Sequence, residues 1–210
     1  MSNGNAPAFF LSYARAPVPE ANAPVERFFE DLRKDVSQLV ALMPGDENGF
    51  MDRNLEAGIH WEPELLRMVG TCRVFIALLS DPYLFRSKWC AMEWDLFSKR
   101  AVTRRGSPGT PGSSTFAQAI LPVIWAPITS PTPDRVGKVQ HFMPSDLPDR
   151  YVNLYRSDGV LGTMNVDAEA YRAVTWKLAL EIQKAVATYD VAPVQREKTT
   201  GLRRTFRGGK

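Results

Sequence analysis

Glu93 is the residue whose type and position first suggest chemistry. It lies within segment 87–97, where a helix of 3.6 residues per turn places it between Trp89 and Phe97 on an apolar arc. A carboxylate among apolar side chains is costly unless a partner neutralises it or a cleft receives it. The segment therefore predicts that the carboxylate of Glu93 either has a neutralising partner or faces a cleft.

Two explanations for this carboxylate stay open from the residues alone. In the first, Glu93 forms a structural ion pair with Arg15 or Arg100. In the second, it lines a cleft and is a functional-site candidate. Ser87 is a good N-cap residue, so the helix that carries Glu93 is expected to begin close to Lys88.

Other side chains offer less chemistry. The two cysteines and two histidines show no metal-ligand spacing, so no metal site is expected. Cys90 is not expected to be a nucleophile because no histidine accompanies it, and both it and Cys72 are expected to be free thiols. A phosphorylatable receiver domain is excluded, since segment 12–15 lacks the paired carboxylates that follow the first strand of such domains.

Composition and charge describe a soluble globular chain, with 44% hydrophobic and 23% charged residues. No apolar run approaches the ~18 residues of a membrane helix, and the N-terminus lacks signal-peptide features, so a cytoplasmic protein is expected. We expect a disordered start at 1–7, one domain at 8–190 and a basic linker or tail at 191–210. The net charge is +3, and because the last sixteen residues carry +5 the rest carries −2. The folded part is therefore not expected to bind nucleic acid, and the tail would bind it only weakly and salt-dependently.

Strand and helix patterns alternate along the chain. Strands are predicted at 8–13, 50–51, 72–80, 119–125 and 151–155, and helices at 25–40, 63–69, 88–98 and 171–186. The prediction is an α/β fold, a flavodoxin-like open parallel sheet of about five strands with helices on both faces. In such sheets ligands bind beyond the carboxyl ends of the strands, so segments 12–15 and 80–83 should lie at that edge near Glu93.

These motifs resemble the Toll/interleukin-1 receptor (TIR) domain family. Segment 10–13 (Phe-Leu-Ser-Tyr) looks like the family's first box, and segment 50–58 is similar to its second strand and BB loop. Segment 65–93 is similar to the stretch that leads to the catalytic helix in plant and bacterial members. The resemblance covers roughly residues 8–126, and several linked motifs are more specific than one. The Cys-x-x-Glu-Trp pattern is closest to actinobacterial TIR-like proteins of the FxsC type.

The resemblance implies an activity. Many TIR domains cleave NAD between nicotinamide and ribose, as substrate rather than cofactor, in bacterial signalling or defence, and their essential glutamate matches Glu93. The positions that it implies for substrate binding are Phe10, Ser12, Tyr13, Arg15, Asp52, Trp89 and Cys90. The alternative is a non-catalytic scaffold that recruits partners through the BB loop, with Arg53, Asn54, Leu55, Gly58 and Trp61. Either reading implies self-association, with other TIR or sensor domains as further partners and no membrane contact.

Overall fold

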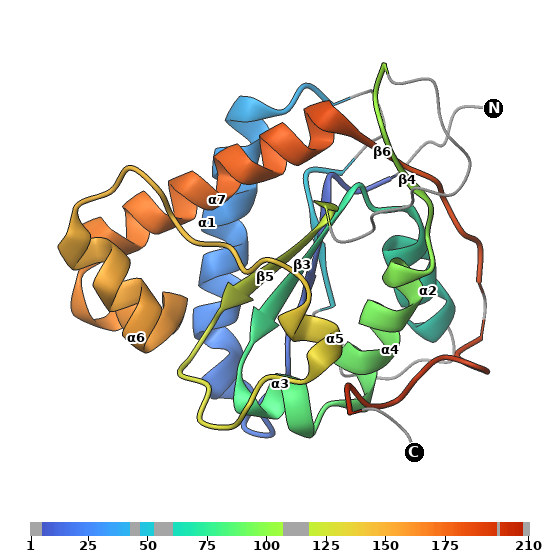
Figure 1. Ribbon diagram of the computed structural model, residues 1–210, viewed down its shortest axis with the longest axis horizontal. Coiled ribbons are helices and arrows are strands. Elements are labelled where there is room, and N and C mark those ends of the chain that lie inside the picture. The colour runs from blue at the N-terminus through green and yellow to red at the C-terminus, as the bar shows by residue number, and fades with distance from the viewer. Residues whose placement is uncertain (1–5, 43–46, 53–60, 107–117, 197, 208–210) are drawn as a thin grey trace.

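The computed structural model describes residues 6–42, 47–52, 61–106, 118–196 and 198–207, apart from the side chain of Trp61. Within these ranges four parallel strands form one sheet, in the order β2-β1-β3-β5 (Figure 1). The strands are β1 (Phe9–Ser12), β2 (Phe50–Met51), β3 (Val74–Leu79) and β5 (Ile120–Ile124). A separate antiparallel pair joins β4 (Val102–Arg104) to β6 (Tyr189–Val191). The prediction of an α/β fold with a parallel sheet is confirmed.

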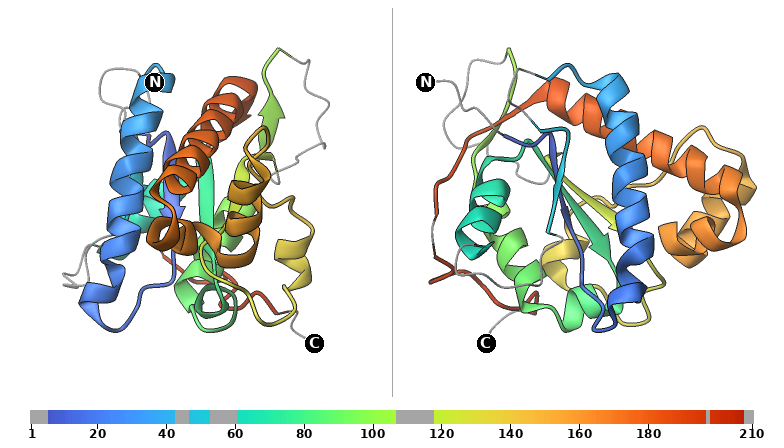
Figure 2. Two further views of the ribbon diagram at one scale, coloured as in Figure 1. Left: turned by 90° about the vertical axis from the view of Figure 1, so that its left-hand side faces the viewer. Right: turned by 180° about the vertical axis from the view of Figure 1, so that it is seen from behind.

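Helices cover both faces of the sheet. Helices α1 (Ala23–Leu39) and α7 (Ala168–Thr188) pack on one face, and α2 (Trp61–Thr71) and α4 (Lys88–Ser98) on the other. Figure 2 shows α1 and α7 in front of the sheet in its left view. A short 3-10 helix, η1 (Pro19–Asn22), precedes α1. The short helix α3 (Asp81–Phe85) follows β3, and the short helix α5 (Asp134–Gly137) follows β5.

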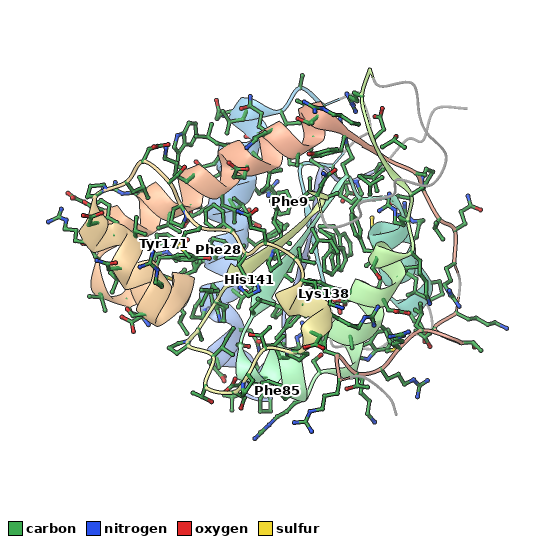
Figure 3. All side chains as sticks on the ribbon, in the orientation of Figure 1. Phe9, Phe28, Phe85, Lys138, His141 and Tyr171 are labelled. Carbon is green, nitrogen blue, oxygen red and sulfur yellow. The ribbon has the colours of Figure 1, made fainter. Side chains whose placement is uncertain are left out.

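The side chains of β1 explain how one strand serves both layers. Successive side chains of a strand point to opposite faces, and Phe9 and Leu11 accordingly join the apolar cluster that α1 and α7 cover. In that layer Phe28 of α1 and Tyr171 of α7, labelled in Figure 3, bring their ring centroids within 6.4 Å. Ser12 lies on the face opposite to Leu11, which turns its hydroxyl toward α4.

Segment 151–155, predicted as an edge strand, is helical instead. It belongs to α6 (Asp149–Val166), which lies beside the first half of α7 at the left of Figure 1. Tyr151, Tyr155 and Gly159 are buried at a spacing of four, which is the spacing of one helix face. The described sheet therefore has four strands where about five were predicted.

Two contacts, at Gly159 and Leu161, join α6 to the end of β5. Gly159 adopts φ +69°, and a Cβ there would lie 2.6 Å from the carbonyl of Trp125. The amide of Leu161 donates to the same carbonyl over 2.9 Å. The kink in α6 therefore fits closely against the end of β5.

The segment after β6 packs against the domain, although its polar and basic composition predicted a linker or tail. Leu202 and Phe206 are buried, with 7% and 2% of their surface exposed. Both belong to the apolar cluster under α2 and α4. The few apolar residues of this polar segment do not predict packing from composition, but Leu202 and Phe206 are buried because the domain offers an apolar surface.

Candidate functional site

Helix α4 presents Glu93 to the interior. Ser87 caps the helix as predicted, because its Oγ accepts the amide of Cys90 over 3.2 Å. The side chain of Glu93 points toward the carboxyl end of β1, and only 7% of its surface is exposed. Ser12, the last residue of β1, donates its hydroxyl to Oε2 of Glu93 over 2.5 Å. The carboxylate is thus fixed by a strand residue across the sheet–helix interface.

Tyr83 extends this contact. It lies in α3, fully buried, and its hydroxyl is 3.0 Å from Oγ of Ser12. Because the single hydroxyl hydrogen of Ser12 is used toward Glu93, Tyr83 is the donor to Ser12. Three residues from β1, α3 and α4 therefore form one hydrogen-bonded chain that ends on the carboxylate.

The environment of Glu93 disfavours its charge. Burial raises the pKa of the Glu93 carboxyl to about 7, the hydrogen bond from Ser12 works against that rise, and the charge of Asp52 adds to it. Near neutral pH the group is consequently a mixture of acid and carboxylate. Such a perturbed acid is typical of functional sites.

The structure excludes Arg100 as the partner of Glu93. The guanidinium of Arg100 donates to the carbonyls of Val69, Cys72 and Ala192, at 2.6 to 2.9 Å, so it is engaged elsewhere. Among the residues described, no ion pair involves Glu93. Arg15 lines the same cavity as the carboxylate without forming such a pair with it. The interpretation that remains is a carboxylate facing a pocket.

A cavity of about 820 Å³ receives the carboxylate. Its walls come from segments at the carboxyl ends of all four parallel strands: residues 13–17 after β1, Asp52 after β2, Ser80 and Pro82 after β3, and residues 125–126 after β5. Strand order reverses between β1 and β3, and the crevice at such a reversal is where open α/β sheets bind ligands. The volume lies within the usual range for small-molecule sites.

The chemistry of the cavity wall is mixed. Arg15, Arg86 and Lys88 bring positive charge, against Glu93 and Asp52. Three aromatic side chains, Tyr13, Trp89 and Trp125, also line it. Cations can hold phosphates and aromatic faces can stack on planar rings, so the wall suits a ligand that contains both.

Most of the predicted substrate-binding residues converge here. Tyr13, Arg15, Asp52 and Trp89 line the cavity, and Ser12 reaches it through Glu93. Tyr13 also donates its hydroxyl to the backbone carbonyl of Asp52 over 2.9 Å, which ties the segment after β1 to the one after β2.

Two predicted positions lie elsewhere. Phe10 is packed in the core between Phe50 and Phe75, with ring centroids 5.7 Å away on each side. Cys90 is almost fully buried, and burial together with the nearby Glu93 holds the pKa of its thiol well above the usual range. Neither lines the cavity.

The predicted BB-loop residues are beyond what the structure describes. Arg53, Asn54, Leu55 and Gly58 lie outside the described residues, and Trp61 begins α2 with its side chain outside them.

Several residues of the site carried no functional prediction, among them Tyr83, Arg86, Lys88 and Trp125. Arg86 and Lys88 flank the N-cap Ser87, and a helix that begins at the ligand edge of a sheet brings such cations to the crevice. That signal was present in the sequence. The contact of Tyr83 with Ser12 depends on the length and direction of α3, which no local pattern encodes.

Comparison with known proteins agrees with this geometry. A family model described as the TIR domain matches residues 9–142, which is well over half of the chain. No curated protein and no solved structure matches the chain. The likeness to FxsC-type proteins stays a prediction. In the described ranges no helix combines the length and the apolar character needed to cross a bilayer. The chain belongs to the TIR domain family.

Proposed function

We propose that this TIR domain is an NAD glycohydrolase in which Glu93 is the catalytic carboxylate. The observation that carries the proposal is the placement of one nearly buried acid, held by Ser12, at the wall of the cavity at the carboxyl edge of the sheet. No ion pair to Glu93 exists among the described residues, so no cation there neutralises it as in a structural ion pair.

The cleavage of NAD needs few catalytic groups. The nicotinamide of NAD is a cationic pyridinium, so the bond from ribose C1′ to the ring nitrogen breaks with its electron pair passing to nitrogen. Nicotinamide leaves neutral, and positive oxocarbenium character develops on the ribose. Water then adds to C1′ and releases a proton to give ADP-ribose, whereas a nucleophilic atom of the same molecule gives a cyclic variant.

Glu93 acts on the charge that develops. A carboxylate beside the ribose stabilises the oxocarbenium centre and accepts hydrogen bonds from the sugar hydroxyls. Its burial lowers the local dielectric, which strengthens this attraction relative to water. The hydrogen bond from Ser12 keeps the carboxylate in one orientation, so little reorganisation is needed in the transition state.

The cavity wall supplies binding groups for the rest of the dinucleotide. Arg15, Arg86 and Lys88 are the cations that would hold the pyrophosphate. Trp89 and Trp125 are the aromatic side chains that would stack on the rings. We propose self-association as part of the function, since the family's sites can be completed across two subunits.

Nicotinamide release tests the proposal. Concentrated or artificially clustered protein is incubated with NAD, and nicotinamide is quantified by chromatography for the wild type, Glu93→Gln and the control Glu64→Gln. Glu64 is an exposed acid on α2 that does not line the cavity. We expect Glu93→Gln to lose at least about 100-fold of the rate, as the loss of one transition-state contact does, and Glu64→Gln to keep it.

The absence of nicotinamide release is informative only when the protein has been clustered. If clustered wild-type protein assembles but releases no nicotinamide, the enzymatic proposal fails and the domain is a scaffold. Equal release by the wild type and Glu93→Gln would instead assign the activity to another group.

A further inference from the structure

A C-terminal strap, residues 192–196 and 198–207, follows β6 and lies against α2 and α4. Figure 1 shows it as the red trace on the outer side of these helices. Backbone hydrogen bonds fix its start: the amide of Ala192 donates to Ala101 over 2.8 Å, and that of Val194 to Gly70 over 2.9 Å. A Cβ on Gly70 would lie 2.1 Å from the carbonyl oxygen of Val194, so only glycine permits this approach. The strap is thus closely fitted to the domain.

A buried acid fixes the middle of the strap. Asp95 of α4 is 1% exposed and accepts the backbone amide of Arg203 over 3.1 Å. The same carboxylate also pairs with Lys99 at 2.7 Å and with Arg135 of α5 at 2.9 Å. Asp95 therefore ties the strap, α4 and α5 together at one point.

The end of the strap covers Tyr83. Phe206 is 2% exposed and stacks on the Tyr83 ring, with centroids 5.5 Å apart and planes inclined by 27°. It also meets the edge of Trp94 at 5.8 Å. Beyond it, Arg207 lies 5.6 Å from the ring of Phe85, which is labelled at the bottom of Figure 3. The Tyr83 ring is consequently fixed by a side chain from the other end of the sequence.

We propose that Phe206 is a positioning residue for Glu93, a role that rests on the proposed function of that carboxylate. Phe206 fixes the ring of Tyr83, Tyr83 donates to Ser12, and Ser12 donates to Glu93. Hydrogen bonds in such a chain strengthen one another, so a looser Tyr83 weakens the bond that Glu93 accepts. The strap acts through this chain and does not itself line the cavity.

The strap is separate from the part of the chain that defines the family. The TIR family model ends at residue 142, and the strap begins fifty residues later. The positioning role is therefore inferred from the contacts of this chain alone.

Titration of Glu93 tests the role without NAD. Protein carrying carboxyl-labelled glutamate is titrated by carbon NMR, and the Glu93 signal is assigned by its loss in Glu93→Gln. Weakening the hydrogen bond to the carboxylate disfavours its charge, so we expect Phe206→Ala to shift the Glu93 titration upward by about half a unit. Phe206→Leu refills most of the volume and should recover part of that shift.

Two further variants separate positioning from general loosening. Phe142→Ala removes a buried ring in the opposite layer, where it packs edge-on against Tyr155, and should leave the Glu93 titration unchanged. Tyr83→Phe keeps the ring and its stacking but deletes the hydroxyl that donates to Ser12, and it should shift the titration upward by about half a unit or more. Because Tyr83→Phe retains the ring, this test remains available if Phe206→Ala does not fold.

The outcomes are distinct. An upward shift in both Phe206→Ala and Tyr83→Phe, absent in Phe142→Ala, supports the role. An unchanged or lowered titration in either variant that folds would overturn it. If the wild type releases nicotinamide, Phe206→Ala should lower kcat at pH 6.5 about threefold with KM unchanged. An upward shift of about half a unit in the pKa of Glu93 lowers the ionised fraction at this pH by that factor. A wild type that releases none would end the proposed function while the titration still decides whether Phe206 positions the carboxylate.

Discussion

Replacing Glu93 by glutamine should stabilise the protein, and increasingly so as the pH rises. The pKa of Glu93 is raised from 4.5 to about 7, chiefly by burial. Between these two values the folded protein keeps a proton that the unfolded chain has released, so raising the pH through this window favours unfolding. Above pH 7 both states are ionised and the cost no longer grows. Glutamine is neutral throughout and avoids this cost.

The size of the effect follows from the difference between the two pKa values. Each unit corresponds to about 1.4 kcal/mol, so the full cost of ionising Glu93 in the fold is about 3 kcal/mol. Between pH 5 and pH 8.5, about 2.5 kcal/mol of this develops. For a domain of this size that equals roughly 5 to 10 °C in melting temperature.

Denaturant unfolding of the wild type and Glu93→Gln at several pH values between 5 and 8.5 measures this effect. The difference in the free energy of unfolding between the two proteins is the quantity to plot, because other titrating groups cancel in it. Any contact that glutamine makes or loses with Ser12 adds a constant offset and does not imitate the slope. Glu64→Gln, at an exposed position, is measured alongside as the control. A flat line for Glu93→Gln would refute the environment assigned to this carboxylate.

Three other substitutions follow from the same contacts. Ser12→Ala deletes the hydrogen bond that favours the ionised form of Glu93, so the titration of Glu93 should move upward by about one unit, measurable by carbon NMR. Asp52→Asn removes a negative charge that raises the pKa of Glu93, so the titration should move downward, and an upward shift would contradict the electrostatics. Gly70→Ala would force a Cβ against the carbonyl of Val194, and denaturant unfolding should show a loss of about 1 to 3 kcal/mol, whereas a neutral effect would mean that the strap is not closely packed there.

The sequence pattern was most informative around Glu93. A helical wheel places this acid on an apolar arc, and the N-cap Ser87 fixes where the helix begins, so the structure could be predicted locally. The parallel strands were also predictable, because β3 is continuously apolar and is buried along its whole length. The edge of the sheet where the cavity lies then follows from the topology of such folds.

The sequence-based predictions fail where one segment fits both a strand and a helix pattern, or where segments far apart in the chain contact each other. Residues 151–155 alternate as a strand does, but Tyr151 and Tyr155 are also four residues apart, and packing against α7 selects the helix. Asp95, two residues after Glu93, is a buried acid because Arg135 and the strap cover it. Contacts between α4 and a segment a hundred residues later leave no periodic signal.

The pH dependence of nicotinamide release by clustered wild-type protein tests the central claim most directly. If the ionised form of Glu93 drives cleavage of NAD from within the cavity, kcat/KM should rise with pH to a plateau with its midpoint near pH 7, because kcat/KM reports the pKa of the free enzyme, which is about 7 for Glu93. The same profile should be absent in Glu93→Gln. Release that is independent of pH between 5.5 and 8.5, or that survives in Glu93→Gln, would contradict the account.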